Sequence, residues 1–391
     1  MEQKLVALSG NEAVAYAFKQ ARPHVAAAFP ITPQTEMMHK YADFVANGES
    51  ATEMILVESE HSAMSAAIGS AAAGARTFTA TSSAGFALMW EVVYIAASLR
   101  LPICMALVNR ALSGNINIHC DHSDSMGGRD AGWIHLFSEN AQESYDNGLM
   151  AWRIAEHLDV RLPVMVNYDG FIISHTADAL YMLPDDVAWK FIGKYKPAYT
   201  LLNPEKPVTV GPLDLTDYYF EHKTSQLAAY EKAPAIIQQV SDEFAELTGR
   251  RYGFAEEYRL DDADLVILLL GSSAGTCKDV VDQYREKGVK VGVLKLRTFR
   301  PFPHAYLAKV LAGRKAVCVL DRSASFGGQG GPLFMETRSA MYGLQVPVRG
   351  YIYGLGGRDF DLKQAASVID DLQKIAAGKE VKDINLLGVR L

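Results

Sequence analysis

Clusters of cysteine, basic runs and long hydrophobic stretches are all missing from this sequence of 391 residues. Its four cysteines, Cys104, Cys120, Cys277 and Cys318, form no CxxC pair and stand in no close set with histidine. Iron–sulfur clusters and structural zinc need several ligands at short, repeated spacings, so we expect this chain to hold neither by itself. Cys104 and Cys318 lie in apolar, strand-like runs and are predicted to be buried free thiols.

An excess of basic residues is also lacking. The chain has 38 Lys and Arg against 45 Asp and Glu, a formal net charge of −7. Nucleic-acid binding needs clustered Lys and Arg, so nucleic acid is excluded as the main partner. The composition, 49% hydrophobic and 21% charged, is that of an ordinary globular protein long enough for two domains.

No hydrophobic run has the length of a membrane span. The run LVILLLG at 265–271 has the length of a buried strand, whereas a membrane helix needs about 20 apolar residues. The first residues, MEQKLVALSG, lack the basic start and long apolar core of a signal peptide. We therefore expect no membrane partner and a cytoplasmic location.

Strand-like and helix-like segments alternate over the first part of the chain. LVALSGNEAVAYAFKQA, 5–21, predicts a short strand, a glycine turn and an amphipathic helix with Asn11 as its N-cap. The pattern recurs at 53–75 and at 76–98, and LPICMALVN, 101–109, is another buried strand. Alternation at this spacing predicts an α/β fold with a doubly wound parallel sheet.

This alternation weakens from about residue 185 to residue 258. Prolines punctuate 194–215, and the stretch that follows, up to Arg251, predicts a charged, mostly exposed helix. A second α/β unit begins at DADLVILLLG, 262–271. We predict two domains, residues 1–255 with the extension and linker, and residues 256–391.

Polar residues follow two of the predicted strands. In AFPITPQT, 28–35, Pro33 keeps Thr32 out of helical geometry at a strand's carboxyl end, where α/β sheets bind ligands; an ordinary turn is the alternative. Glu58 and Glu60 stand at the next strand–helix junction. A carboxylate there either interacts only with the helix dipole or controls the protonation of a nitrogen base. The residues alone leave both alternatives open.

Arg110 directly follows the buried strand at 101–109, and its guanidinium group suits bidentate capture of a carboxylate. The loop after it is dense in His, Asp and Arg. A metal site built from His119, Asp121 and His122 is conceivable, but adjacent residues rarely converge on one ion. A polar loop with internal hydrogen bonds is the favoured interpretation.

Three glycine-rich segments lie in the second domain. GSSAGT, 271–276, resembles a phosphate-binding turn but has neither the GxGxxG nor the GxxxxGK[ST] spacing, which favours a plain strand–helix turn. SFGGQGGP, 325–332, and YGLGGRD, 353–359, suggest backbone contacts with a ligand or a neighbouring subunit.

Taken in order, these motifs resemble the alpha subunit of pyruvate:ferredoxin oxidoreductase and its 2-oxoacid:acceptor oxidoreductase relatives. The resemblance rests on AFPITPQT, VESEHSAMSAA, NRALSGNINIHCDHSDSM, RDAGWIHLF, LPVMVNYDGFIISH, GPLDLTDYYFEHK, LRTFRPFP, VLDRSASFG and YGLGGRD, which span nearly the whole chain. It implies a thiamine-diphosphate-binding domain of the pyrimidine type, followed by a domain like the C-terminal domain of transketolase.

The same resemblance implies that thiamine diphosphate is shared with a partner subunit. This sequence has no GDG…N-type segment of the kind that holds the diphosphate and Mg²⁺ in thiamine enzymes. The resemblance therefore assigns Mg²⁺ and the [4Fe–4S] clusters to beta, gamma and delta-type subunits. It implies coenzyme A as the acyl acceptor and ferredoxin or another electron acceptor, with activity only in the complex.

The resemblance also assigns roles to individual residues of this sequence, position by position. Glu60 matches the family's glutamate that faces N1′ of the pyrimidine, and is expected to activate the cofactor. Arg110 matches the arginine that binds the substrate carboxylate, and Thr32 matches its hydrogen-bonding partner. Pro30 is expected to pack on the cofactor rings, and no metal ligand is expected in this chain.

Pyruvate is the expected substrate, although some positions depart from the common pyruvate pattern. Phe29 stands where tyrosine is usual, Asn115 where proline is frequent, and Ala84, Phe86 and Trp90 also differ. A branched or aryl 2-oxoacid such as phenylglyoxylate is therefore an alternative, as is linkage to NAD through a flavin subunit. Further rivals are a non-oxidative thiamine transferase or decarboxylase, and a scaffold subunit without chemistry, in which Glu60, Arg110 or Thr32 would be replaced.

Overall fold

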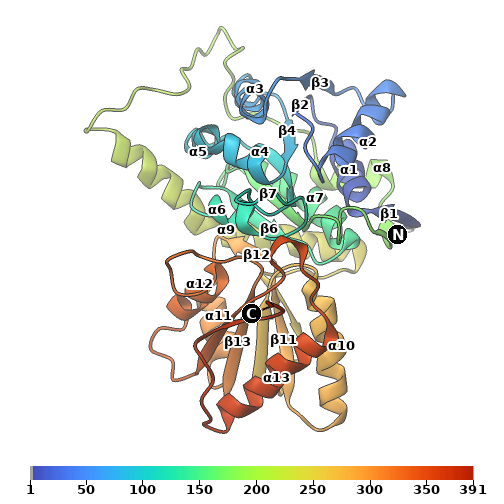
Figure 1. Ribbon diagram of the computed structural model, residues 1–391. Helices are drawn as coiled ribbons and strands as arrows, with labels where there is room; N and C mark the ends of the chain where they lie inside the picture. The colour runs from blue at the N-terminus through green and yellow to red at the C-terminus, as the bar shows by residue number, and fades with distance from the viewer. Residues whose placement is uncertain (1–2, 391) are drawn as a thin grey trace.

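The computed structural model describes residues 3–390 and arranges them in two α/β units, one above the other in Figure 1. The first unit has a seven-stranded sheet in the order β12-β6-β7-β5-β4-β2-β3. Every neighbouring pair is parallel except β12 with β6. Its strands are β2 (Val25–Ala28), β3 (Glu53–Leu56), β4 (Thr77–Thr81), β5 (Cys104–Asn109), β6 (Ile134–Phe137), β7 (Val164–Asp169) and β12 (Thr298–Arg300). The predicted doubly wound parallel sheet is confirmed.

Helices cover both faces of this sheet because its strands are apolar on both sides. In β5 the side chains of Cys104, Ala106 and Val108 enter one core, and those of Met105 and Leu107 enter the other. Helices α1, α2, α7, α8 and α9 contribute to the first core, and α3 and α5 to the second. The helices of this unit are α1 (Gly10–Gln20), α2 (Thr35–Ala46), α3 (Glu60–Ala72), α4 (Ser83–Leu88), α5 (Trp90–Ser98), α6 (Ser123–Gly127), α7 (Ala141–Glu156), α8 (Asp185–Ile192) and α9 (Tyr219–Thr248).

The second unit has a six-stranded sheet in the order β15-β14-β13-β10-β11-β9, parallel except for β9. Its strands are β9 (Ala255–Tyr258), β10 (Leu265–Leu269), β11 (Val291–Leu296), β13 (Ala316–Asp321), β14 (Val348–Ile352) and β15 (Ile384–Leu386). Its helices are α10 (Ser273–Glu286), α11 (His304–Leu311), α12 (Pro332–Ala340) and α13 (Leu362–Ala376), with a 3₁₀ turn at Leu355–Gly357. Helices α10 and α13 pack on one face, and α11 and α12 on the other.

Strand β12 connects the two units. Strand β12 follows β11 of the second sheet directly in the sequence, yet it pairs antiparallel with β6 at the edge of the first sheet. Between the units, the segment 197–218 leaves the body of the molecule and returns at α9 (Figure 1). The domain boundary at 255/256 stays a prediction.

Three local expectations need correction. Asn11 is not the N-cap of α1; Ser9 caps it, in a capping box with Glu12. Strand β1 (Lys4–Ser9) does not join the parallel sheet but pairs antiparallel with β8 (Ala177–Met182) in a separate sheet. The helix α9, expected to be mostly exposed, buries a stripe at helical spacing that runs from Ala229 to Phe244, which fixes its second half in the core.

The four cysteines are free and buried, as expected for Cys104 and Cys318. Burial raises the pKa of each thiol, because the thiolate would lose its hydration. None of the helices within residues 3–390 combines the length and the apolar character that a membrane crossing requires.

Candidate functional site at the carboxyl edge of the first sheet

Glu60 is the first residue of α3, four positions after β3 ends. The helix begins there because Ser59 is extended and its hydroxyl accepts a hydrogen bond from the backbone N–H of Ser62. This capping turns Glu60 inward, where it is only 6% exposed, while Glu58 is left exposed. The structure therefore separates the two acids that the sequence placed at this junction.

Nothing within residues 3–390 forms a hydrogen bond or ion pair with the Glu60 carboxylate that would account for its burial. Gly85 in α4 lies beside it: a Cβ atom at that position would lie 2.5 Å from Glu60 Oε1 and 2.6 Å from the hydroxyl oxygen of Thr81. That hydroxyl is buried and has no hydrogen-bond partner in the described chain. The Glu60 carboxylate and the Thr81 hydroxyl thus both lie beside Gly85, and the hydroxyl is a buried group with unused hydrogen-bonding capacity.

Arg110 and Thr32 come together at the carboxyl ends of β5 and β2, which lie on either side of β4. Arg110 follows β5 directly and Thr32 follows β2, and Nη1 of Arg110 donates to the backbone carbonyl of Thr32 at 2.9 Å. Nε of Arg110 donates to the carbonyl of Asn117, also at 2.9 Å. Burial lowers the pKa of Arg110, with Asp124 opposing the shift. The side chain of Thr32 is exposed.

The loop that carries Thr32 is fixed by a hydrogen bond from Asn11. The side-chain amide of Asn11 donates to the carbonyl of Pro33 at 2.9 Å and accepts from the hydroxyl of Tyr168 at 2.9 Å. Pro30, at the entrance of the same loop, is exposed. Asn11, the residue we expected to cap a helix, instead fixes the position of this loop.

Asp124 organises the backbone around Arg110. It is fully buried in α6 and accepts hydrogen bonds from the backbone N–H groups of Arg110, Ser83 and Ser125 and from the side chain of Asn109. Burial raises the pKa of its carboxyl group to about 6, although these hydrogen bonds act in the opposite direction. One carboxylate thereby joins the end of β5 to the start of α4, the helix that carries Gly85.

Where the two units meet, Asp169 at the end of β7 is completely buried. Its carboxylate binds His122 at 2.7 Å and Arg322 at 2.9 Å, and it accepts from the backbone N–H and hydroxyl of Ser272. Burial opposes its charge, but Arg322 and His122 hold the pKa of Asp169 well below its usual value. The GSSAGT segment joins β10 to α10, as the favoured strand–helix turn predicts, and its Ser272 also binds the Asp169 carboxylate.

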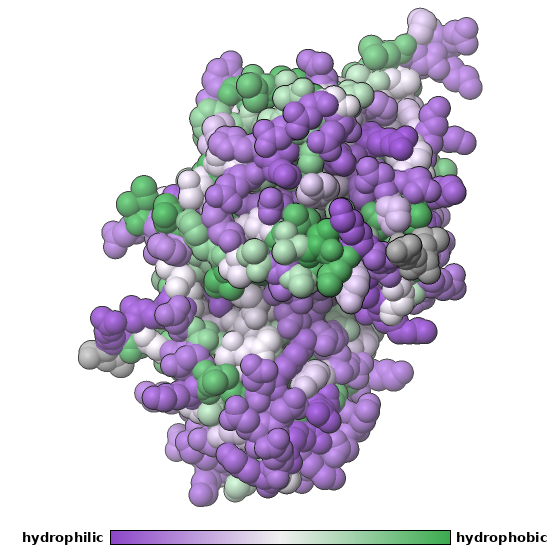
Figure 2. Space-filling view, turned by 90° about the vertical axis from the view of Figure 1, so that its right-hand side faces the viewer, coloured by the Kyte–Doolittle hydropathy of each residue, from purple (hydrophilic) through white to green (hydrophobic). Residues whose placement is uncertain are grey.

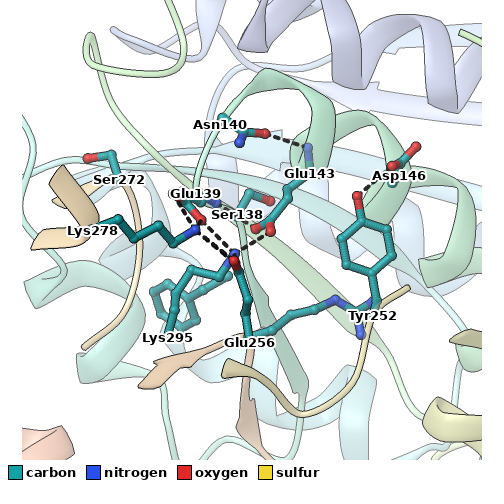
Figure 3. Close-up of polar contacts among 12 residues, drawn as sticks. Ser138, Glu139, Asn140, Glu143, Asp146, Tyr252, Glu256, Ser272, Lys278 and Lys295 are labelled. Atoms are coloured by element: carbon teal, nitrogen blue, oxygen red, sulfur yellow. Dashed lines mark hydrogen bonds and ion pairs between the residues drawn. The ribbon is translucent and has the colours of Figure 1, made fainter. Parts of the chain in front are cut away.

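A second charged cluster joins the units beside α7 (Figure 3). Lys295 of β11 reaches Glu139, Glu143 and Glu256, and Lys278 of α10 binds Glu139 and Glu256. Burial disfavours the ammonium form, yet the three carboxylates raise the pKa of Lys295 above its usual value. These ion pairs therefore connect Glu139 and Glu143 of the first unit with Lys278 and Lys295 of the second.

Among residues 3–390, two groups of side chains have a spacing that could hold a metal ion: Cys120, His122 and Asp169, and also Glu139, Glu143 and Glu256. Arg322 occupies one oxygen of Asp169, and the ammonium groups of Lys278 and Lys295 lie among the three glutamates. The group considered from the sequence, His119, Asp121 and His122, does not converge. His119 is exposed, Asp121 accepts from Ser123 and Gly356, and His122 turns to Asp169.

The carboxyl ends of parallel strands meet at one edge of a sheet, and Thr32, Glu60, Thr81, Arg110 and Asp169 all lie at or just after such ends. Sequence reasoning missed Thr81, Gly85, Asp124, Asp169 and Arg322. Asp169 and Arg322 could have been found by the rule that selected Arg110, since each is a polar residue at the end of an apolar strand. No local signal marks Gly85 or Asp124.

The comparisons with known proteins decide the family. Residues 16–242 match the model of the pyruvate flavodoxin/ferredoxin oxidoreductase thiamine-diphosphate-binding domain, and residues 263–365 match pyruvate:ferredoxin oxidoreductase core domain II. The chain belongs to the pyruvate flavodoxin/ferredoxin oxidoreductase family. The resemblance found in the motifs is confirmed, and with it the oxidoreductase class and the thiamine-binding fold.

The relatives of similar length are named for two different substrates, pyruvate and ketoisovalerate. Pyruvate synthase subunit PorA of Thermotoga maritima is 56% identical over 94% of each chain. Ketoisovalerate oxidoreductase subunit VorA of Pyrococcus horikoshii is 45% identical over 96% of each.

Two solved structures support the fold. The 2-oxoglutarate:ferredoxin oxidoreductase of Magnetococcus marinus matches with a TM-score of 0.74 and 19% identity, covering 95% of this chain and 65% of that one. A split-gene transketolase, an inactive beta4 tetramer, matches with a TM-score of 0.56 and 14% identity, covering 96% of this chain and all of that one.

The residues at the carboxyl edge fit an aminopyrimidine ring. The Thr81 hydroxyl is buried without a partner in the described chain, the Glu60 side chain is 6% exposed, and the missing side chain at Gly85 lets the backbone of α4 approach both closely. A ring nitrogen is a base that a carboxyl group can protonate or donate to. These side chains are therefore compatible with the pyrimidine end of thiamine diphosphate, and the described residues at this edge include no group of cations suited to its diphosphate.

Proposed function

We propose that this chain is the alpha subunit of a CoA-acylating 2-oxoacid:ferredoxin oxidoreductase and that pyruvate is its substrate. The reaction converts a 2-oxoacid, coenzyme A and an oxidised acceptor into acyl-CoA, CO₂ and the acceptor reduced by two electrons. One observation carries the proposal: Glu60 is only 6% exposed at the start of α3, at the carboxyl edge of the sheet, and its carboxylate lies against Gly85 of α4. The PorA relative at 56% identity favours pyruvate.

When bound, thiamine diphosphate supplies the carbon nucleophile that adds to the 2-oxo carbon and retains the electron pair as CO₂ leaves. Glu60 holds a proton at N1′ of the pyrimidine and so sets the protonation state of its amino group. Arg110 binds the carboxylate of the 2-oxoacid with its remaining N–H donors, and Thr32 offers its exposed hydroxyl beside it. Pro30 lies at the entrance of the same loop and packs against the cofactor.

Partner subunits complete the site in this proposal. Apolar side chains are exposed around it: Leu56 at the end of β3, Leu88 in α4, Trp90 in α5 and Ile116 in the loop after Arg110. Figure 2 presents the side that lies to the right in Figure 1; on it, separate apolar patches stand out in the upper unit, while the lower unit is mostly hydrophilic. Beta, gamma and delta-type subunits would cover the apolar surface, hold the diphosphate with Mg²⁺ and carry the [4Fe–4S] clusters.

A branched-chain 2-oxoacid is the second candidate substrate, favoured by the VorA relative at 45% identity. Phe86, one of the unusual positions, is buried against Gly128, whereas Ala84 is exposed in α4. Of these two, only Ala84 is placed to alter the surface that a substrate meets. A cytoplasmic location stays a prediction.

The test is to purify the native complex and assay pyruvate, 2-ketoisovalerate and phenylglyoxylate, each with ferredoxin, viologen and NAD. We expect CoA-dependent reduction of ferredoxin, with the highest kcat/KM for pyruvate. Release of CO₂ from pyruvate without reduction of any acceptor would instead identify a non-oxidative thiamine enzyme.

A further inference from the structure

The loop that follows Arg110 is in contact with the second unit of the chain. Residues 111–120 leave the end of β5 and pass beside the YGLGGRD segment, 353–359, which follows β14. Nδ2 of Asn117 donates to the carbonyl of Gly356 at 3.0 Å. The backbone N–H of Gly357 donates to the carbonyl of Cys120 at 2.6 Å, and that of Gly356 donates to Asp121 at 3.1 Å.

Asn117 connects this contact to Arg110. Its backbone carbonyl accepts from Nε of Arg110, and its side-chain oxygen accepts from the N–H of His119 at 2.6 Å, an Asx turn that fixes the loop. The same side chain thus closes the turn with its oxygen and binds the second unit with its nitrogen. Arg110 has two backbone acceptors, Thr32 on one side and Asn117 on the other.

Glycine is required where the two segments meet. Gly356 has a φ of +59°, and a Cβ atom there would lie 2.5 Å from Nδ2 of Asn117. Gly357 has a φ of +79°, and a Cβ atom there would overlap the side chain of His119. The glycines of the YGLGGRD segment therefore allow the close approach. The segment contacts Asn117, whose backbone carbonyl accepts a hydrogen bond from Arg110.

We infer that Asn117 and Gly356 are positioning residues for the substrate: the second unit sets the direction of the Arg110 guanidinium group through the loop 111–120. The inference rests on the proposed role of Arg110 in binding the 2-oxoacid carboxylate. It gives the transketolase-like unit a part in 2-oxoacid recognition, although it contributes no side chain that touches the substrate. The YGLGGRD segment, expected to contact a ligand or another subunit, contacts a loop of its own chain.

Gly356→Ala in the purified complex is the first variant. Its control is Gly343→Ala, because Gly343 also has a positive φ, +86°, but nothing lies within 4 Å of a Cβ atom there. We expect Gly356→Ala to raise the KM for the 2-oxoacid about tenfold, the effect of weakening one charge-assisted hydrogen bond, with the KM for coenzyme A unchanged. Gly343→Ala should change neither.

Asn117→Ser is the second variant, in case Gly356→Ala does not fold. A serine hydroxyl can still accept from the N–H of His119, but it is too short to reach Gly356. We expect the same rise in the KM for the 2-oxoacid, and faster amide hydrogen exchange at Ala111, whose backbone N–H donates to the carbonyl of His119 in this loop. Unchanged KM and exchange in both variants would overturn the inference.

Arg110→Lys separates this inference from the proposed function. If Arg110→Lys raises the KM for the 2-oxoacid and Gly356→Ala adds nothing further in the double variant, the two residues act through one contact. If the effects of Arg110→Lys and Gly356→Ala simply add, the positioning role is wrong while the role of Arg110 stands. If Arg110→Lys leaves that KM unchanged, the proposed role of Arg110 fails, and the inference with it.

Discussion

Arg110 donates from Nη1 to the backbone carbonyl of Thr32 across the ends of two parallel strands, at 2.9 Å. The contact brings together the two residues expected to bind the substrate carboxylate, but through the backbone of Thr32 and not its hydroxyl. Since Nη1 and Nε both donate hydrogen bonds, the orientation of the guanidinium group is fixed. Its other N–H donors stay available to a ligand.

Arg110→Ala should raise the KM for the 2-oxoacid by about one to two orders of magnitude, because losing a charge-assisted hydrogen bond costs roughly 1.5–3 kcal/mol. The KM for coenzyme A should change much less. Steady-state kinetics of the complex with each substrate varied in turn measure both values. Arg22→Ala is the matched control, since Arg22 is exposed before β2, at the opposite edge of the sheet. Equal increases in both KM values would count against the assignment.

Gly85→Ala should reduce turnover at least tenfold, because its methyl group would displace the Glu60 carboxylate and the Thr81 hydroxyl, and small misplacements of reacting groups are costly. Gly69→Ala in α3 is the control, because a Cβ atom there has nothing within 4 Å. That change should leave activity intact and stabilise the helix by up to about 1 kcal/mol. Comparing kcat with the thermal midpoint separates the two effects. Full activity of Gly85→Ala would show that the close approach is not needed.

How far the sequence predicts this site depends on how far apart in the sequence the contacting residues lie. Glu60, Arg110 and Thr32 follow apolar strands, so the parallel sheet alone predicts that they meet at one edge. The choice of Glu60 over Glu58 needed the resemblance, and the structure gives its physical reason: only Glu60 is buried. Periodicity therefore predicted that these residues lie close together, whereas the role of each residue came from the resemblance.

Contacts between distant segments were not predictable in this way. Asp124 binds Ser83, 41 residues earlier, and Asn117 binds Gly356, 239 residues later. Such pairs depend on how helices and units pack, which no local pattern encodes. The pairing of β12 was not predictable either. Its sequence follows directly on β11 of the second unit, but its hydrogen bonds are made to β6 of the first sheet.

The pairing of Asp169 with Arg322 should make stability depend on pH in the acid range. The folded state holds the pKa of Asp169 below its ordinary value of 3.8, so its contribution is present above that value and is lost as the pH falls through and below it. Urea unfolding of the purified chain between about pH 7 and pH 3 measures this. Asp169→Asn should be less stable by about 3 kcal/mol at neutral pH and show a shallower acid dependence. An unchanged slope would mean that the pair adds nothing to folding.

Lys295→Met should destabilise the chain by about 3–5 kcal/mol, because it leaves Glu139, Glu143 and Glu256 without their buried partner. Lys278→Met is the matched control. Lys278 binds two of the same acids but is more exposed, 18% against 3%, so its loss should cost less. Denaturant unfolding gives the free energies, and limited proteolysis between the two units reports their separation. A larger effect at Lys278 would contradict the assignment of Lys295 as the centre of the cluster.

Glu60→Gln in the reconstituted complex tests the central claim most directly, with Glu58→Gln as the matched control. Glutamine keeps the size of the side chain but cannot hold the proton that the pyrimidine N1′ requires. Turnover of pyruvate should fall by about 10²–10⁴, the usual contribution of acid–base catalysis, with subunit assembly and thiamine diphosphate content unchanged. Glu58→Gln should retain full activity. A Glu60→Gln complex that turns over like the unmodified enzyme would contradict the account.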